Sequence, residues 1–375
     1  MVGDLNDTPN GSRIRISFFG LRNAGKSTLV NAFTGQPVAI VSDVAGTTTD
    51  PVSKAMEILP LGPCLVTDTA GLDDEGPLGE QRVRKSLGVL ATTDIAVWVV
   101  GPGDGEARAR FDEECARRSI SVLEYRRGDP VEELKRRVAS LRSSELTPGL
   151  LDGLVAPGDR VVCVCPIDES APKGRLILPQ VQTVRDCLDR GAWCLVCQPR
   201  ELGAVLAAVP CSLVVTDSQA FGEVSAAVKR SASGGRDAPR LTSFSILFAR
   251  QKGDLGEYVR GLESIQSLRD GDVVLVAEGC THHRQCNDIG TVKIPKALLK
   301  MTGRNLRFSF ASGGAFDFGH GAGRARLVVQ CGGCMLTRRE VMRRIALCRE
   351  AGVPIVNYGM LLAAANGLPV GDVLA

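Results

Sequence analysis

A glycine-rich loop near the start of the chain has the residue types and spacing of a phosphate-binding site. Residues 20–27 are G-L-R-N-A-G-K-S, which fits the pattern G-x-x-x-x-G-K-[ST]. The loop lies between a strand-like apolar run and a helical run, the context that this pattern requires. Backbone N–H groups of such a loop wrap phosphates at the positive end of the helix, Lys26 reaches the β- and γ-phosphates, and Ser27 holds Mg²⁺. The residues expected at this nucleotide site are Asn23, Ala24, Gly25, Lys26, Ser27 and Thr28.

Two polar motifs farther along the chain complete this nucleotide site. Asp68 directly follows a strand-like run and opens the sequence D-T-A-G, which ends at Gly71. A carboxylate at the end of a strand that follows a phosphate loop suits Mg²⁺ binding, so we assign Asp68 and Gly71 to the site. Between the loop and Asp68 lies G-T-T-T-D at residues 46–50, a polar stretch that can act as a switch.

Three cysteines lie in turns that favour metal binding. The sequence Q-C-G-G-C places Cys331 and Cys334 in a tight turn whose two glycines let both sulfurs face one metal. Cys280 and Cys331 each follow a strand-like apolar run. Strands of one parallel sheet end on the same edge, so the three sulfurs can converge there.

A helix is expected directly after the Q-C-G-G-C turn. Thr337 and Glu340 have the spacing of a capping box, which predicts a helix over residues 338–349. The dipole of that helix is expected to lower the pKa of the nearby thiols and to favour an anionic cluster. A lone C-x-x-C also suits a zinc half-site or a redox pair, and the residues alone leave these alternatives open. Two neighbouring histidines, His282 and His283, suit either ligation or hydrogen bonding to a ligand.

A second C-x-x-C, formed by Cys194 and Cys197, serves as an internal control. It lies within a strand-like apolar run, where residues i and i+3 point to opposite faces, so its sulfurs cannot bind one metal. We assign both cysteines to the core, together with Cys163 and Cys165, which share one face of another strand-like run.

The elements that must position these motifs fall into three segments. Polar and Pro/Gly-rich stretches mark the boundaries between them. They predict a nucleotide-binding domain at residues 1–148, a second domain at residues 149–239, and a third domain, which contains the cysteine turns, at residues 240–375. In each segment strand-like runs alternate with helical runs. This alternation predicts α/β domains with parallel sheets.

Composition places the chain among ordinary globular proteins. Hydrophobic residues make up 44% of the 375 residues, charged residues make up 23%, and the formal net charge is +3. A charge so near neutral does not imply an extended nucleic-acid surface, so no nucleic-acid partner is expected. No apolar run has the length of a membrane helix and residues 1–12 carry no secretory signal, which predicts no membrane partner and a cytoplasmic location. In a reducing compartment, 13 cysteines suit metal and core roles better than disulfides.

The three nucleotide motifs together resemble the translation-factor class of GTPases, and more narrowly the group of tRNA-modifying and ribosome-assembly GTPases. The resemblance implies that Thr48 holds Mg²⁺ with Ser27 and that Lys26 is catalytic. Leu72 stands where Ras-like enzymes keep their water-positioning glutamine, and Glu80 matches a glutamate that orients the attacking water in related enzymes. A solvated helix start is the other interpretation of Glu80. Some members of this group are activated by potassium. The resemblance implies that K⁺ is bound here by Asn23, Ser42, Val44 and Thr47.

The first domain is one βα unit shorter than this resemblance requires. After Val100 a complete G domain needs two further units, one of which ends its strand in N-K-x-D to recognise guanine, but only one unit fits before residue 148. Residues 126–129 are R-R-G-D. They are either a degenerate guanine loop or a sign that the guanine-recognising unit was deleted.

Blocks along almost the whole chain resemble the FeFe-hydrogenase maturation GTPases, the HydF family. In order, they are P-I-D-x-x-A-P-K-G-R-L-I-L-P-Q at residues 166–180, T-D-S-Q-A-F at 216–221, L-T-S-F-S-I-L-F-A-R at 241–250, C-T-H-H at 280–283, D-I-G-x-V-K-I-P at 288–295 and C-G-G-C-M at 331–335. The resemblance implies a P-loop GTPase domain, a central dimerisation domain, and a domain that holds a 4Fe-4S cluster through Cys280, Cys331 and Cys334. It also implies a homodimer.

By the same resemblance, the chain hydrolyses GTP, carries a two-iron subcluster precursor and delivers it to apo FeFe-hydrogenase. The precursor is built with the radical-SAM maturases HydE and HydG. Gln330 stands where the family commonly has histidine, and glutamine is a poor iron ligand. The fourth iron position is therefore open, holds water, or takes a nearby residue such as Cys286.

Two other functions compete with this one. An RNA- or ribosome-associated GTPase of the tRNA-modification group explains only the first third of the chain and predicts a basic carboxy-terminal RNA module, against which the three cysteines and the near-neutral charge argue. An iron–sulfur carrier with a vestigial GTPase domain agrees with the missing N-K-x-D, whereas the intact Lys26, Ser27 and Asp68 favour activity.

Overall fold

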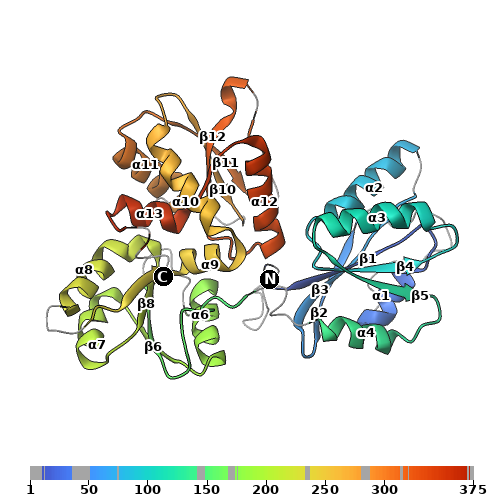
Figure 1. Cartoon of the computed structure of the whole chain (residues 1–375), viewed down its shortest axis with the longest axis horizontal. Coiled ribbons are helices and arrows are strands. Elements are labelled where there is room, and N and C mark those ends of the chain that lie inside the picture. The colour runs from blue at the N-terminus through green and yellow to red at the C-terminus, as the bar shows by residue number, and fades with distance from the viewer. Residues whose placement is uncertain are drawn as a thin grey trace. The chain divides into compact units, whose positions relative to one another are not determined.

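A computed structural model of the 375-residue chain shows two compact units, Met1–Thr147 and Pro148–Ala375 (Figure 1). The structure describes residues 11, 13–35, 51–73, 76–141, 148–167, 174, 176–232, 237–279, 288–312, 316–319, 321–369 and 371. None of the helices in these ranges is both long and apolar enough to cross a membrane.

The first unit contains one five-stranded sheet in the order β2-β3-β1-β4-β5. Its strands are β1 (Ile14–Phe19), β2 (Val52–Ile58), β3 (Gly62–Asp68), β4 (Ile95–Val100) and β5 (Ser121–Arg126). Its helices are α1 (Lys26–Thr34), α2 (Gly76–Leu90), α3 (Gly105–Arg117) and α4 (Val131–Ser140). Apolar residues of α1 and α4 pack on one face of the sheet and those of α2 and α3 on the other, so both faces are covered (Figure 1).

The sheet of the first unit differs in one respect from the parallel sheet expected from the sequence. β2 pairs with β3 in the antiparallel direction, whereas the other pairs are parallel. Most side chains of β2 are exposed, so this strand lacks the apolar run by which the others were recognised. In the part of the unit that the structure describes, β5 is the last strand. This confirms a domain one βα unit short.

The second unit contains two four-stranded parallel sheets. The first has the order β7-β6-β8-β9 and the second the order β11-β10-β12-β13. The strands of the first sheet are β6 (Arg160–Val164), β7 (Trp193–Cys197), β8 (Leu213–Thr216) and β9 (Arg240–Ser243). Those of the second are β10 (Val273–Glu278), β11 (Arg307–Ser312), β12 (Ala325–Gln330) and β13 (Ile355–Asn357). Parallel strands need crossover connections, and helices provide most of them.

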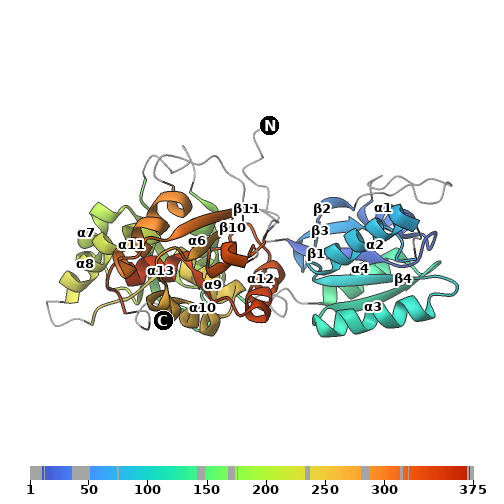
Figure 2. The same ribbon diagram turned by 90° about the horizontal axis from the view of Figure 1, so that it is seen from above.

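The helices of the second unit cover both sheets. They are α6 (Leu178–Asp189), α7 (Leu202–Ala208), α8 (Phe221–Ser231), α9 (Phe244–Lys252), α10 (Leu255–Ser264), α11 (Ile294–Thr302), α12 (Arg338–Ala351) and α13 (Tyr358–Ala365). Side chains cap several of them: Ser243 accepts the N–H of Ile246 at α9, and Thr337 accepts the N–H of Glu340 at α12, as the capping-box spacing predicts. α11 and α13 lie side by side (Figure 2).

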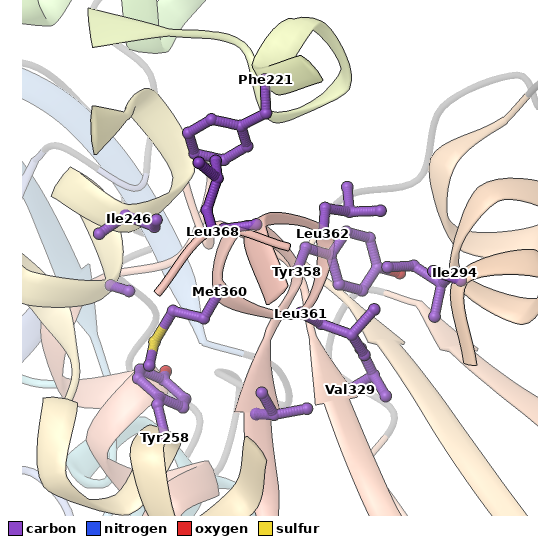
Figure 3. Packing of buried hydrophobic residues seen from close by; sticks show 14 of the residues in the cluster. Phe221, Ile246, Tyr258, Ile294, Val329, Tyr358, Met360, Leu361, Leu362 and Leu368 are labelled. Atoms are coloured by element: carbon purple, nitrogen blue, oxygen red, sulfur yellow. The ribbon is translucent and has the colours of Figure 1, made fainter. Parts of the chain in front are cut away.

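One continuous apolar cluster joins the two sheets of the second unit. It includes Val162 and Val214 of the first sheet and Val276 and Val329 of the second. Figure 3 shows part of this cluster, in which the side chains of α13 occupy the centre. Because these residues are buried in one cluster, the two sheets share a core.

Strand β9 follows the domain boundary suggested by the sequence, yet it belongs to the sheet that precedes that boundary. The division of the second half into residues 149–239 and 240–375 stays a prediction, but β9, which begins at Arg240, pairs with β8 in the first sheet. The helix that follows it, α9, also packs against α6 of the 149–239 segment. The chain thus enters the cysteine-bearing segment through an element of the preceding sheet.

Candidate functional sites

The phosphate loop connects the end of β1 to the start of α1, as the motif requires. Gly20 has φ of 151°, and a Cβ at this position would lie 2.6 Å from the carbonyl oxygen of Val99, so only glycine fits. Asn23 and Gly25 also have positive φ, 61° and 94°. This backbone turns the loop around the start of α1, whose first N–H groups lack partners within the helix.

Lys26 folds back onto its own loop. Its Nζ donates to the carbonyl oxygens of Leu21 (2.7 Å) and Gly20 (3.2 Å), and only 7% of the residue is exposed. The loop residues Ala24 and Gly25 are half-buried, and Thr28 is exposed beside them on α1. The ammonium group therefore already lies within the cradle that a phosphate chain would enter.

Asp68 meets Ser27 at the end of β3, where the sequence places the Mg²⁺ site. Its Oδ2 accepts a 2.6 Å hydrogen bond from the Ser27 hydroxyl, while its buried Oδ1 has no hydrogen-bond partner. Burial raises the pKa of Asp68, and the bond from Ser27 and the charge of Lys26 partly offset this rise. A fully buried carboxylate with an unpaired oxygen fits a Mg²⁺ ion held by Ser27 and, through water, by Asp68.

The segment after Asp68 packs directly against the phosphate loop. A Cβ on Gly71 would lie 2.8 Å from the amide nitrogen of Arg22, so this approach needs glycine. The Arg22 N–H donates to the Asp73 carboxylate at 2.5 Å, and the Leu72 N–H donates to Gly20 at 3.3 Å. Asp73 was not singled out from the sequence. Its place directly after D-T-A-G, in a segment that must touch the loop, was the available signal.

Other residues of the expected nucleotide site fall outside what the structure describes. Thr48, the Mg²⁺ ligand expected in the switch, and Ser42, Val44 and Thr47, the expected K⁺ ligands, lie within residues 36–50. Glu80 lies on α2, but its side chain is also outside the described part. The roles of these five residues stay predictions.

The R-R-G-D turn follows β5 on the same sheet edge as the phosphate loop. β5 is parallel to β4, which is the neighbour of β1, so all three strands end at this edge. The turn closes on itself: Asp129 Oδ2 accepts the Arg126 N–H at 2.8 Å, and the Tyr125 hydroxyl donates to the Asp129 carbonyl at 3.1 Å. Asp129 is exposed at the place where the base-recognising turn of a G domain is expected.

The C-x-x-C turn lies at a switch point of the second sheet in the second unit. After β10 the chain goes to β11 on one side and then returns to β12 on the other, and Ala277 pairs with Gln330 across the β10–β12 junction. Open parallel sheets bind ligands at the carboxyl ends of such strand pairs. Cys331 begins the turn here, and its sulfur accepts the Gly279 N–H at 3.1 Å. Gly279 is the residue before Cys280.

The two cysteines of the turn are half-buried. Burial raises the pKa of both, although the N–H groups of Gly333 and Gly279 lower that of Cys331 and the charge of Lys252 lowers that of Cys334. Loss of hydration outweighs the nearby donors, so the net pKa shift of both free thiols is upward, and the expected contribution of the α12 dipole stays a prediction. Thiols whose pKa is raised in this way become ligands when a metal replaces the proton.

Two buried cationic groups flank the C-x-x-C turn. Lys252, at the end of α9, donates to three carbonyl oxygens of residues 333–336, and burial lowers its pKa to about 8. Arg344 of α12 is fully buried and donates to Gln330 Oε1 at 3.2 Å. Gln330 Nε2 lies 3.8 Å from the Cys331 sulfur, so Gln330 faces the cysteine as a donor. Neither cation was identified from the sequence.

The control cysteines behave as the strand geometry predicts. Cys194 packs against the apolar cluster on one face of its sheet, and Cys197 packs against the cluster on the opposite face. Cys163 and Cys165 are buried on the Cys194 side. The sulfurs of Cys163 and Cys194 lie 3.6 Å apart, in van der Waals contact within the core.

The third expected cluster ligand lies outside the described residues. Cys280, His282, His283 and Cys286 all fall within residues 280–287. Among the residues that the structure does describe, no group of three or more His, Cys, Asp or Glu side chains could hold a metal ion. The Cys331–Cys334 turn thus offers two soft ligands, and the Gly279–Cys331 hydrogen bond brings the backbone that precedes Cys280 to the same place.

Three family models match the chain. The model described as Hydrogen maturase F dimerization domain matches residues 150–253, and the one described as Hydrogen maturase F tetramerization domain matches residues 256–370. The model described as 50S ribosome-binding GTPase matches residues 15–129. The first two models together span most of the second unit, and the third spans most of the first.

Curated relatives match part of the chain. The tRNA modification GTPase MnmE of Methylobacterium sp. (strain 4-46) is 40% identical over 113 residues, which are 28% of this chain and 26% of that protein. MnmE of Erythrobacter litoralis (strain HTCC2594) is 31% identical over 175 residues, 43% of this chain and 39% of its own length. The chain thus spans about a quarter to two fifths of these relatives. A crystal structure of an Aquifex aeolicus Era variant bound to GDP.AlF4- covers 81% of this chain and 94% of its own. It is 13% identical with a TM-score of 0.27, too low to carry an argument.

Proposed function

Because the chain belongs to the hydrogenase maturase F (HydF) family, we propose that it hydrolyses GTP in its first unit and holds a 4Fe-4S cluster in its second. The observation that carries this proposal is the Cys331–Cys334 turn at the β10–β12 switch point, in a chain that also has a complete phosphate loop. When bound, the cluster supplies an iron–sulfur centre beside which a two-iron precursor is carried as cargo. Cys280, Cys331 and Cys334 are the proposed ligands.

The first unit has the parts that bind a nucleoside triphosphate. Lys26 leaves the carbonyl oxygens of its own loop and contacts the β- and γ-phosphates, a move over a short distance within the same cradle. Ser27 and, through water, Asp68 would hold Mg²⁺, and the unpaired Oδ1 of Asp68 is available to accept from such a water. Leu72 cannot orient the attacking water, so we assign this role to Glu80. We assign the offset of phosphoryl charge to Lys26 and to a K⁺ ion near Asn23.

Guanine selectivity is expected to be weak in this chain. The R-R-G-D turn keeps an acidic residue, Asp129, but has no asparagine and has Arg127 in place of lysine. The Asp129 carboxylate is also engaged by the Arg126 N–H. A base can therefore gain few directed hydrogen bonds here, and GTP is preferred over ATP by less than in relatives with an intact N-K-x-D.

The second unit suits a homo-oligomer. β7 is an edge strand, and apolar side chains on it and on α6 are exposed: Trp193 is 66% exposed, Leu188 63%, and Val181 and Val196 48% each. These residues lie within the region matched by the dimerization model. We propose that a second copy of the chain covers this surface, because an exposed apolar edge strand otherwise invites aggregation. Trp193→Asp should convert the dimer to a monomer in light scattering, while Leu59→Asp, on the other unit, should not.

The partners of the proposed carrier are the apo FeFe-hydrogenase, which receives the two-iron precursor, and the radical-SAM maturases HydE and HydG, which supply it. Binding and hydrolysis of the nucleotide act as a switch on this exchange. The phosphate loop lies in the first unit and the Cys331–Cys334 turn in the second, so the switch must connect two separate sites.

One experiment tests both halves of the proposal. The full chain is purified under anaerobic conditions, its iron and sulfide are measured, and its phosphate release from GTP is followed in the same preparation. We expect close to four iron and four sulfide ions per chain and a turnover that needs Mg²⁺. A preparation that binds zinc in place of iron, or that stays free of iron after reconstitution, would contradict the cluster assignment.

A further inference from the structure

The side chain of Lys252 holds the cysteine turn from a distant part of the chain. Lys252 is the last residue of α9, in the region matched by the dimerization model. Its Nζ donates to the carbonyl oxygens of Leu336 (2.7 Å), Gly333 (3.1 Å) and Cys334 (3.3 Å). Only 3% of the residue is exposed, so these bonds form in a dry environment.

The geometry around Nζ fixes both the position and the charge of this group. Three carbonyl acceptors match the three N–H donors of an ammonium group, whereas a neutral amine has only two. The Nζ also lies 5.0 Å from the centre of the Phe248 ring, which favours a cation. The ammonium group is therefore held in one place, in contact with the backbone carbonyl of Cys334.

A buried lysine is a costly way to hold a turn. Burying an ammonium group carries a large loss of hydration, and well-packed apolar residues often stabilise a core at least as well. The charge at this site is consequently better explained by an anion close by than by packing alone. The Cys334 carbonyl accepts from Nζ, so one of the two turn cysteines is in direct contact with the ammonium group.

The other end of α9 also contacts the turn. The Ser245 hydroxyl lies 3.2 Å from Asn357 Oδ1, at the carboxyl end of β13. A Cβ on Gly332 would lie 3.1 Å from the same hydroxyl, so the turn approaches the start of the helix closely. α9 therefore touches the C-x-x-C turn near its first residue through Ser245 and at its last residue through Lys252.

We propose that Lys252 is a positioning residue for the 4Fe-4S cluster: its ammonium group holds the Cys331–Cys334 turn in its ligating shape and raises the reduction potential of the cluster. The inference rests on the proposed ligation by Cys331 and Cys334. Reduction adds one negative charge to a cluster that its thiolates already make anionic. A fixed positive charge in a dry site stabilises the reduced form more than the oxidised form, and net charge is among the factors that set these potentials.

The test is an EPR-monitored redox titration of the full chain, reconstituted with iron and sulfide under anaerobic conditions. Lys252→Gln removes the charge and keeps two N–H donors, while Lys252→Arg keeps the charge. We expect the Gln variant to shift the equilibrium between reduced and oxidised cluster at least tenfold toward the oxidised form. For a one-electron couple this is a fall of about 59 mV in midpoint potential. The Arg variant should stay near the unmodified protein.

Lys300→Met is the matched control. Lys300, an exposed residue of α11, also donates to a backbone carbonyl, that of Ala365 at the end of α13 (2.8 Å). Its loss should leave the midpoint unchanged. A Gln variant with the same midpoint as this control overturns the proposal, because a purely structural role for Lys252 does not move the potential of a cluster that still binds.

Two further outcomes remain decisive. If Lys252→Gln does not fold, the uncharged Lys252→Met variant takes its place: a midpoint shifted at least tenfold toward the oxidised form supports the proposal, and a midpoint equal to that of Lys300→Met contradicts it. If the unmodified chain binds no iron, the proposed cluster function itself fails. That result differs from a bound cluster whose potential ignores Lys252.

Discussion

Two buried lysines of this chain end on the carbonyl oxygens of a loop at the carboxyl edge of a sheet, and they differ in where they come from. Lys26 contacts carbonyls five and six residues before it in its own loop. Lys252 contacts carbonyls 81 to 84 residues after it, from a helix outside the turn. The first lysine can leave with little disturbance of its surroundings, whereas the second joins two elements of the second unit.

The difference indicates opposite demands on the two sites. A phosphate loop must exchange its internal bonds for bonds to a ligand in every cycle, and one acceptor of Lys26, the Gly20 carbonyl, also receives the Leu72 N–H. A cluster turn must keep its shape while iron and sulfide are bound. Long-range bonds from a buried charge suit the second demand, because breaking them exposes several unsatisfied groups at once.

The largest expected effect separates the cluster edge from the cysteines of the core. Cys331→Ala and Cys334→Ala each remove a ligand, so we expect loss of the 4Fe-4S signal in EPR and of the bound iron. Cys280→Ala should do the same. Cys194→Ala is the control, since Cys194 belongs to a C-x-x-C whose members face opposite sides of a sheet. A Cys194 variant that loses the cluster while the Cys280 variant keeps it would show that the ligands are misassigned.

The next effect concerns the nucleotide edge. Lys26→Ala should lower the rate of GTP hydrolysis by at least about 10²–10³, the usual cost of removing one donor from a developing charge. The iron content and the circular dichroism of the chain should remain unchanged, because the cluster edge is in the other unit. Phosphate release that continues at the normal rate would point to a contaminating enzyme or to another site.

The sequence predicts those parts of the two sites that depend on interactions between residues close together in the chain. The phosphate loop is continuous from Gly20 to Ser27, so its place between a strand and a helix could be recognised from the pattern. The opposite faces of Cys194 and Cys197 follow from the two-residue period of a strand. Thr337 lies at the start of α12 because a capping box spans only four residues. In each case the decisive interactions lie within a few residues.

What the sequence does not predict depends on distant partners or on exposed edges. β2, β9 and β11 were not recognised because they lack a long buried apolar run: most side chains of β2 are exposed, none of β11 is buried, and β9 has only four residues. Lys252 and Arg344 resemble ordinary helix-end or helix-surface cations until the turn at residues 330–336 folds against them. The pKa rise of the two turn thiols likewise depends on burial by several elements at once.

The comparison of the two lysines gives a third prediction, on stability without ligands. Lys252→Met removes the Nζ donor from the carbonyls of Cys334 and Leu336, while Gly333 keeps the Leu336 N–H. Each unsatisfied carbonyl in a dry site costs about 1–3 kcal/mol, so the second unit should lose at least about 2 kcal/mol. Lys26→Met should cost the first unit less than about 1 kcal/mol, because Gly20 keeps the Leu72 N–H and a buried charge is removed. The two units need separate probes, and hydrogen exchange in β12 and in β1 provides them. Equal losses in the two units would remove the distinction between a fixed and a movable lysine.

The smallest expected effect is the dependence of hydrolysis on potassium. Leu72 cannot orient a water or donate charge, so another group must offset the negative charge of the phosphoryl group in transfer. A K⁺ ion held by Asn23 and by the loop that contains Ser42, Val44 and Thr47 can do so. It takes the place of an arginine finger, a role worth about 10³–10⁵ in rate where an arginine fills it. We expect the effect here to be only several-fold, because the proposed dimer contact lies in the second unit and not beside this loop.

The measurement compares GTP hydrolysis in K⁺ and in Na⁺ at matched ionic strength on cluster-loaded protein. Asn23 is exposed and has φ of 61°, so its side chain does not contribute to the core. Asn23→Ala should therefore remove the preference for K⁺ while leaving the unit folded and the slower rate in Na⁺ intact. Asn→Ala in a left-handed conformation carries some strain, so Asn23→Gly is the matched variant that removes the amide and keeps the backbone. Equal rates in the two salts for the unmodified chain, or a K⁺ preference that survives in both variants, would exclude an ion at Asn23 and leave Lys26 as the main source of positive charge at the phosphates.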